Sequence, residues 1–209
     1  MDGLLIDSEP LWYEASVEIL SRFSKQLTHK EYAETMGLRT KECVERWFLD
    51  FDLPVKYAPE TERNIEDLVV DKIKTKGKPM PGVAHIFNYF KELNFKIGLA
   101  SSSAMRIIDV VVDKLDIGNY LLAIESAEKL EYGKPHPQVY LNCADALQSK
   151  PIECICFEDS FNGMIAAKAA KMKCIVVPSA LESQHAKFGA ADLRLSSLTN
   201  FNGLLLNAL

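Results

Sequence analysis

Short apolar runs alternate with helical segments over the last two thirds of the chain. Residues 95–100 (FKIGLA) form one such run, and residues 104–115 follow with apolar side chains three and four positions apart, which predicts a helix. The same alternation predicts strands over 121–124, 154–157 and 174–177, and helices over 137–147 and 162–171. Near-continuous apolar strands between helices are typical of a parallel sheet covered on both faces. We therefore expect an α/β fold.

The segment after residue 10 differs, because it has helical periodicity and no strand-like run. Thr28 and Glu31 have the spacing of a capping box, which marks the start of a helix. Glycine and proline residues between 77 and 82 then interrupt the helical pattern, as a linker would, and Gly82 is a candidate hinge. We expect a small inserted α-helical domain over residues 11–78, within an α/β core of residues 1–10 and 79–209.

The chain is weakly acidic, with 24 lysine and arginine residues against 29 aspartate and glutamate residues and a net charge of −5. Proteins that bind nucleic acids or anionic membranes depend on a basic surface, so we expect no nucleic-acid partner. The longest apolar run, residues 120–124, is far shorter than the roughly 18 residues that indicate a membrane span. We therefore expect no membrane association either.

The five cysteines indicate neither a disulfide framework nor a zinc site, because their number is odd and no pair has CxxC spacing. Cys154 and Cys156 alternate with apolar residues in a predicted strand. Such cysteines act as small apolar side chains and stay reduced inside the cell. We expect free thiols and a cytoplasmic protein.

Polar residues follow the predicted strands at their carboxyl ends, where ligands bind in open parallel sheets. The residues at these places are Asp2-Gly3, Ser101-Ser102-Ser103, Gly133-Lys134-Pro135 and Glu158-Asp159-Ser160. The carboxylates suit a hard cation such as Mg²⁺, whereas the lysine and the serine hydroxyls suit phosphate oxygens. Together they indicate phosphoryl chemistry assisted by a metal.

Each of these motifs alone also has a purely structural interpretation. An Asp-Gly pair is a common turn, serines after a strand often cap a helix, and carboxylates at the start of a helix are favoured by its dipole. A lysine such as Lys134, between a glycine and a proline, is most often a solvated loop charge. The order, the spacing and the shared position at strand ends favour the functional interpretation.

The motifs together resemble the haloacid dehalogenase superfamily, which has four of them in this order. They are DGLLIDSEP at residues 2–10, Ser101 after a strand, GKPHP at residues 133–137 and EDSFNG at residues 158–163. The helical insert between the first two motifs is similar to the small cap of the β-phosphoglucomutase-like branch. The resemblance implies a Rossmann-like parallel sheet as the core and residues 11–78 as the cap.

The resemblance also implies roles for the polar residues at the strand ends. Asp2 would protonate the leaving alkoxide and later activate water. Ser101 would hold a phosphoryl oxygen, with the backbone amide of Ser102 nearby. Lys134 would neutralise charge on the phosphoryl group and orient the nucleophile.

The implied cofactor is Mg²⁺. The resemblance implies that Asp159 binds it directly, that Glu158 binds it directly or through water, and that Asp2 contributes its backbone carbonyl. In the cap, Arg39 belongs to an MGLR motif at residues 36–39 and would contact the substrate. A solvent-exposed charge on a surface helix is an equally good interpretation of Arg39.

The implied function is a Mg²⁺-dependent phosphatase that hydrolyses small sugar phosphates through an aspartyl-phosphate intermediate. SAEKL at residues 126–130 and GKPHPQVYL at residues 133–141 resemble phosphatases acting on hexose 6-phosphates, hexitol 6-phosphates or 2-deoxyglucose 6-phosphate. A phosphomutase built on the same core is one alternative, and a non-catalytic phosphate-binding module is another. The expected partner is a small phosphorylated sugar or sugar alcohol, and we expect a monomer.

One part of the first family motif is absent from the sequence. The family's nucleophile is the first aspartate of an Asp-x-Asp-Gly motif, and it would lie one place before Met1, at the end of an apolar strand central in the sheet. Without that strand, its neighbours would have unpaired backbone groups, each costing about 1–3 kcal/mol when buried. We therefore expect a start assigned at an internal methionine or a truncated form, which would be inactive by itself.

We predict that the in-frame codons immediately before Met1 encode an apolar stretch of about five or six residues that ends in aspartate. Sequencing the gene upstream of this codon checks the prediction. A stop codon or a polar stretch at this place would instead favour the non-catalytic module.

Overall fold

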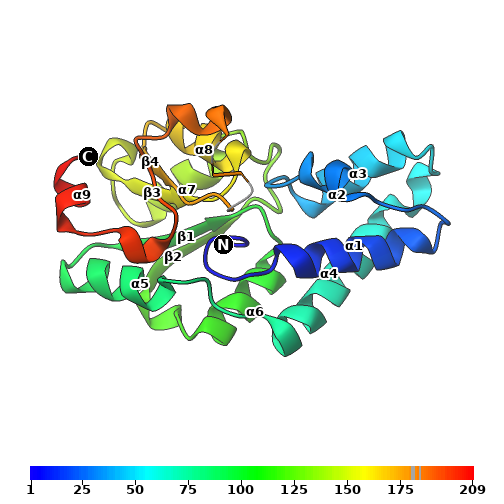
Figure 1. Cartoon of the computed structure of the whole chain (residues 1–209), viewed down its shortest axis with the longest axis horizontal. Helices are drawn as coiled ribbons and strands as arrows, with labels where there is room; N and C mark the ends of the chain where they lie inside the picture. The colour runs from blue at the N-terminus through cyan, green and yellow to red at the C-terminus, as the bar shows by residue number, and fades with distance from the viewer. Residues whose placement is uncertain (180–181, 184) are drawn as a thin grey trace.

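Five parallel strands in two sheets form the centre of the structure, a computed structural model that describes residues 1–179, 182–183 and 185–209 (Figure 1). In the first sheet, β1 (Ile97–Ser101) pairs with β2 (Leu121–Ser126). In the second sheet, β4 (Lys173–Val176) lies between β3 (Ile155–Glu158) and β5 (Leu193–Arg194). Because the paired strands are parallel, those of each sheet end at the same edge.

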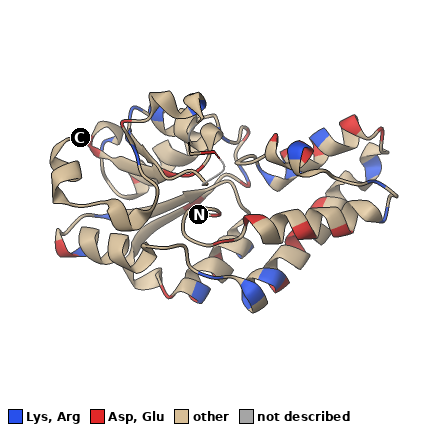
Figure 2. Cartoon of the chain, in the orientation of Figure 1, with Lys and Arg blue, Asp and Glu red and all other residues tan. Residues whose placement is uncertain are grey.

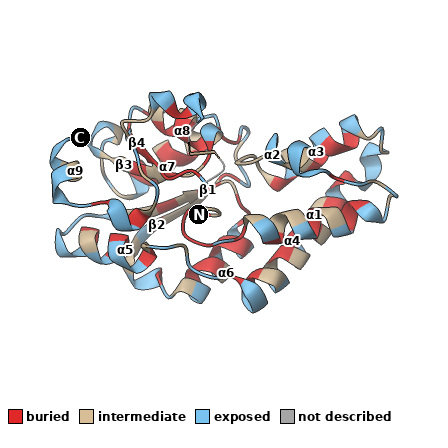
Figure 3. Ribbon diagram, in the orientation of Figure 1, coloured by how far each residue is buried: buried red, intermediate tan, exposed pale blue. Residues whose placement is uncertain are grey.

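Helices cover both sheets, and their inward faces are buried while their outward faces are exposed (Figure 3). α7 (Gln138–Ala146) packs against β1 and β2, α8 (Phe161–Ala169) against β3 and β4, and α6 (Met105–Leu115) against β2. These elements confirm the α/β fold, with boundaries that differ from the predicted ones by two residues at most. The sequence did not single out α5 (Val83–Glu92), α9 (Gly203–Asn207) or β5.

The predicted cap contains four helices that extend away from the sheets (Figure 1). They are α1 (Glu9–Ser21), α2 (His29–Ala33), α3 (Thr40–Asp50) and α4 (Ala58–Lys76). The capping box at Thr28 and Glu31 is present at the start of α2, as predicted. The two connections to the core lie side by side, because the Asp7 amide donates to the Lys78 carbonyl at 2.9 Å. The domain division at residues 11 and 78 stays a prediction.

Short 3-10 helices complete the described part of the chain. They are η1 (Val55–Tyr57), η2 (Gly118–Tyr120), η3 (Pro151–Glu153), η4 (Ala186–Ala190) and η5 (Leu198–Asn200).

The strands do not form the single sheet expected from the sequence. β1 pairs only with β2, and β3 pairs only with β4, so each has one unpaired edge. An apolar slot with a volume of about 430 Å³ lies between these edges, and Met1, Leu4 and Leu5 line part of it. The physical reason for the split is that, in the described residues, no strand lies between β1 and β3 to bond with both.

The charges on the surface agree with the weakly acidic composition. Charged residues of both signs are distributed over the helices in the view of Figure 2. All five cysteines are free thiols, as predicted, and Cys143, Cys156 and Cys174 are buried. Among the described residues, no helix is long and apolar enough to cross a membrane.

Gly82 precedes α5 with φ +92° and packs against η5, so it is fixed by packing as well as by its backbone conformation. A Cβ at this position would lie 2.3 Å from the backbone nitrogen of Thr199. We predict that Gly82→Ala lowers the free energy of unfolding by about 1–3 kcal/mol, measured by urea denaturation. Gly189→Ala is the matched control, because a Cβ there meets nothing within 4 Å. Equal stability of the two variants would contradict the prediction.

Candidate active site

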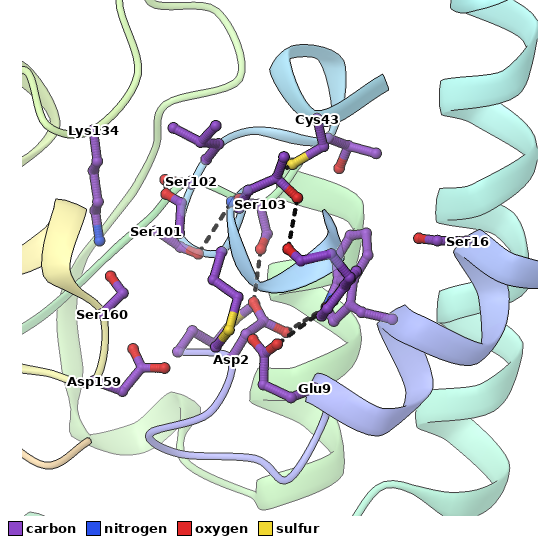
Figure 4. A pocket seen from close by; sticks show the side chains of 18 of the residues that line it. Asp2, Glu9, Ser16, Cys43, Ser101, Ser102, Ser103, Lys134, Asp159 and Ser160 are labelled. Atoms are coloured by element: carbon purple, nitrogen blue, oxygen red, sulfur yellow. Dashed lines mark hydrogen bonds between the residues drawn. The ribbon is translucent and has the colours of Figure 1, made fainter. Parts of the chain in front are cut away.

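A pocket of about 90 Å³ lies between the strand ends and the cap (Figure 4). All of the predicted site residues except Arg39 line it. β1 ends at Ser101 and β3 ends at Glu158, so the sheet edges place both residues as expected. Residues of α1, α2 and α3 form the opposite wall. The structure therefore brings six of the seven predicted site residues together.

Three donors fix the carboxylate of Asp2. Its Oδ1 accepts hydrogen bonds from Ser8 Oγ at 2.6 Å and Trp12 Nε1 at 2.8 Å, and its Oδ2 accepts one from Ser103 Oγ at 2.7 Å. Ser8 precedes α1, yet its hydroxyl bonds to Asp2 and makes no side-chain cap of the helix. A carboxylate held in this way presents its oxygens in one orientation, which suits proton transfer.

The serines after β1 serve two purposes. Ser101 is buried, and its Oγ accepts a hydrogen bond from the Ser103 amide at 3.2 Å. The hydroxyl of Ser102 donates to the carbonyl of Gly37 in the cap at 3.0 Å. Ser101 and Ser103 thus organise the floor of the pocket, while the side chain of Ser102 contacts the cap.

Lys134 and Glu158 form a buried ion pair. Lys134 Nζ lies 2.6 Å from Glu158 Oε1, and both residues are about 5% exposed. Tyr140 donates to the same oxygen, and Oε2 accepts from the backbone amides of Asp159 and Ser160. The interpretation of Lys134 as a solvated loop charge is therefore wrong. Because donors surround both oxygens of Glu158, this residue holds Lys134, and its role as a metal ligand stays a prediction.

The pKa values of this pair follow from burial and mutual attraction. Burial alone would raise the pKa of Glu158, but the neighbouring ammonium of Lys134 and other donors lower it to about 2. Burial alone would lower the pKa of Lys134, but Glu158 outweighs it and raises that pKa. Both groups are therefore charged at neutral pH.

Asp159 is the opposite case. No described residue donates a hydrogen bond to its carboxylate, and a Cβ at Gly3 would lie 2.2 Å from its Oδ2. Burial, and next the charge of Glu158, raise the pKa of Asp159 well above its usual value. A partly buried carboxylate without a donor fits a divalent cation. In the described residues, no three histidine, cysteine or acidic side chains are placed so that they could hold one metal ion together, so a Mg²⁺ site here would also need the Asp2 carbonyl and water.

Arg39 joins the cap to the core and does not line the pocket. Its guanidinium donates to the Leu130 carbonyl at 2.5 Å and pairs with Glu42 at 2.6 Å. Its side chain is only 12% exposed, so the interpretation as a solvent-exposed charge is wrong. Substrate contact by Arg39 stays a prediction, and in this structure the residue holds the cap closed.

The closed cap is held at a second place, where Gly37 approaches α8. Asn162 Nδ2 donates to the Met36 carbonyl at 3.2 Å. Gly37 has φ +82°, and a Cβ there would lie 2.8 Å from Ser160 Oγ. A side chain at this position would therefore push the cap away from the core.

Sequence reasoning did not identify Glu9 and Tyr32, which form part of the cap wall. Tyr32 donates from its hydroxyl to Glu9 Oε2 at 3.0 Å. Burial and the nearby charge of Asp2 raise the pKa of Glu9 to about 7. Ser8, Trp12 and Tyr140 were missed as well, although Ser8 lies in the first motif and Tyr140 in the stretch at residues 133–141.

Comparisons with known proteins show which family the chain belongs to. The family model described as haloacid dehalogenase-like hydrolase matches residues 1–177. Hexitol phosphatase B of Escherichia coli (strain K12) is 38% identical over 200 residues, which cover 95% of this chain and 90% of that protein. A putative phosphatase of Bacillus subtilis (strain 168), YhcW, is 32% identical over 209 residues, covering 98% and 92%.

A solved structure has the same fold. β-Phosphoglucomutase from Clostridium difficile superposes with a TM-score of 0.87 and 22% identity, covering 99% of this chain and 92% of that one. At this identity the likeness supports the α/β architecture with its cap, and the site must be judged from its own residues.

We predict that Lys134→Met lowers the free energy of unfolding by about 3–5 kcal/mol in metal-free buffer, because it leaves Glu158 charged and buried without its partner. In the wild type, the pKa of Glu158 lies below its unfolded value of 4.5, so its contribution to stability is lost as the pH falls from 4.5 toward 2. In the variant, burial raises the pKa of Glu158 above its unfolded value. Protonation of Glu158 then stabilises the folded state, so the variant loses less stability than the wild type on acidification.

Denaturant unfolding between pH 2 and pH 8 measures this difference. The double variant Lys134→Met with Glu158→Gln is the control, since it removes both charges and should recover part of the lost stability. An unchanged stability of Lys134→Met would be incompatible with a buried ion pair.

Proposed function

Because the chain belongs to the haloacid dehalogenase-like hydrolase family, we propose that it is a phosphatase of small sugar phosphates. The observation that carries the proposal is the buried ammonium of Lys134, in a pocket with Ser101 and Asp159 (Figure 4). A fixed cation and a hydroxyl at the end of a strand suit the oxygens of a phosphoryl group. The similarity to hexitol phosphatase B supports hexitol phosphates as the first substrates to test, followed by hexose and 2-deoxyglucose 6-phosphates.

The residues of the pocket divide the work of hydrolysis. Lys134, Ser101 and the amide of Ser102 bind the phosphoryl oxygens and reduce their charge, which favours attack on phosphorus. Asp2 gives a proton to the leaving alkoxide oxygen and later takes one from the attacking water. The closed cap excludes bulk water from the pocket during these steps.

The proposed cofactor is Mg²⁺, held by Asp159 and the backbone carbonyl of Asp2. It would screen the charge of the phosphoryl group and of Asp159. The raised pKa of Asp159 supports this assignment, because burial and the charge of Glu158 disfavour its ionised form, and a bound cation would favour it.

The proposed aspartyl-phosphate requires one more carboxylate at the pocket. Met1 lines both the pocket and the slot between the sheets. Burial raises the pKa of Asp159, and the ammonium of Met1 is close enough to oppose that effect. An aspartate joined to the amino end of Met1 would therefore lie at the pocket, and we assign it as the nucleophile.

We also propose that the reaction takes place in the cytoplasm, where the free thiols stay reduced.

The test is release of inorganic phosphate from sorbitol 6-phosphate and mannitol 1-phosphate, with Mg²⁺ and with a chelator. The protein is compared in the present form and with its upstream in-frame residues. Activity of the extended form that depends on Mg²⁺ is the expected result. Conversion of a hexose 1-phosphate to the 6-phosphate without phosphate release would contradict the phosphatase proposal and show a phosphomutase. Binding without turnover by either form would favour the non-catalytic module.

We predict that Asp2→Asn lowers kcat of the active form by about 10²–10⁴-fold and changes KM little, because the amide keeps its place but cannot transfer the proton. Steady-state phosphate release measures both constants. Asp7→Asn is the matched control, since Asp7 is an exposed aspartate of the same segment and does not line the pocket. A similar loss in the two variants would remove Asp2 from the mechanism.

A further inference from the structure

Two polar side chains in the cap wall of the pocket have no hydrogen-bond partner among the described residues. They are Ser16 on α1, whose Oγ is unpaired, and Trp47 on α3, whose Nε1 is unpaired. Both residues line the pocket, and they are only 1% and 3% exposed. In Figure 4, Ser16 lies on the opposite side of the pocket from Lys134. Ser16 therefore belongs to the end of the pocket remote from Lys134, and Trp47 lines the same pocket from α3.

The side chains of Trp12, Tyr32 and Thr35 in this wall are paired, in contrast to those of Ser16 and Trp47. Trp12 Nε1 donates to Asp2 at 2.8 Å, and the Tyr32 hydroxyl donates to Glu9 at 3.0 Å. The ring of Trp47 stacks on that of Tyr32 with 6.3 Å between centroids, which places it in the same wall. An unpaired buried donor costs about 1–3 kcal/mol, and native proteins keep few of them without a functional reason.

The chemistry of this end identifies the class of group that would satisfy both side chains. The indole of Trp47 only donates, so its partner must be an acceptor, while the hydroxyl of Ser16 can do either. Lys134 is the only cationic side chain among the described residues that line the pocket, and it lies at the other end. A neutral hydroxyl fits this end, whereas a second phosphate or a carboxylate does not.

We propose that Ser16 and Trp47 bind hydroxyl groups at the end of a polyol monophosphate that is remote from its phosphate. This inference rests on the proposed function and narrows it, because it selects a long, neutral, hydroxyl-bearing substrate and rejects sugar bisphosphates. Trp47 Nε1 donates to one hydroxyl oxygen, and Ser16 Oγ exchanges a hydrogen bond with the same or a neighbouring hydroxyl. These two residues determine specificity and take no part in the chemical step.

The experiment measures equilibrium binding by calorimetry, so it does not depend on turnover. The 209-residue chain and the variants Ser16→Ala and Trp47→Phe are each titrated with sorbitol 6-phosphate and with methyl phosphate, which has no remote hydroxyl. Each variant should bind sorbitol 6-phosphate about 3- to 10-fold more weakly than the wild type, the value of one hydrogen bond. Binding of methyl phosphate should not change.

Ser21→Ala is the matched control, because Ser21 lies on the same helix, is exposed and bonds only to the Glu18 carbonyl. Thermal unfolding identifies any loss of fold in Trp47→Phe. If that variant does not fold, Ser16→Ala decides the test by itself, because it removes only one oxygen atom. Wild-type binding that is equally strong for both ligands, or unchanged binding in Ser16→Ala, would overturn the inference. So would tighter binding of a hexose bisphosphate than of sorbitol 6-phosphate.

The outcome for the proposed function is separate. If the variants lose selectivity for sorbitol 6-phosphate but no form releases phosphate, the binding inference holds and the phosphatase proposal fails. If phosphate is released but Ser16→Ala binds and turns over sorbitol 6-phosphate as the wild type does, the phosphatase holds and this inference fails.

Discussion

The buried ion pair between Lys134 and Glu158 is the interaction on which the rest of the site depends. It joins the loop before α7 to the end of β3, and the hydroxyl of Tyr140 ties α7 to the same carboxylate. Removing either charge would leave the other buried without compensation, so the two positions are coupled. In return, the ammonium of Lys134 is held without solvent at the pocket, where a fixed charge acts more strongly on a phosphoryl group than it would in water.

The two aspartates of the pocket are distinguished by their surroundings. Asp2 accepts three hydrogen bonds from side chains, which fix its orientation. Asp159 accepts none from the described side chains, and burial raises its pKa. These surroundings support the roles that we propose, proton transfer for Asp2 and Mg²⁺ binding for Asp159. Identical functional groups acquire different roles because donors and burial differ around them.

The cap forms one wall of the pocket and makes its two ends chemically different. Contacts from Arg39 to the carbonyl of Leu130, and from Ser102 to that of Gly37, hold it against the core. The core end offers a cation and a hydroxyl for a phosphate, and the cap end offers two neutral hydrogen-bonding groups. A molecule that satisfies both ends is charged at one end and hydroxylated at the other. In the proposed function, the cap shields a molecule bound at both ends from bulk water.

The sequence by itself determined the α/β class, most strands and helices, and six residues that meet in the pocket, because apolar periodicity is local and parallel strands end at a common edge. Only the tertiary structure decided which side chains hold those residues. Ser103 is 101 positions from Asp2, and Arg39 is 91 positions from the carbonyl of Leu130, so neither contact has a periodic signal. The separation of the two sheets, the burial of Lys134 and the unpaired groups of Ser16 and Trp47 were likewise decided in three dimensions. Pairing and burial depend on which distant segments fill the neighbouring space, and no local pattern records that.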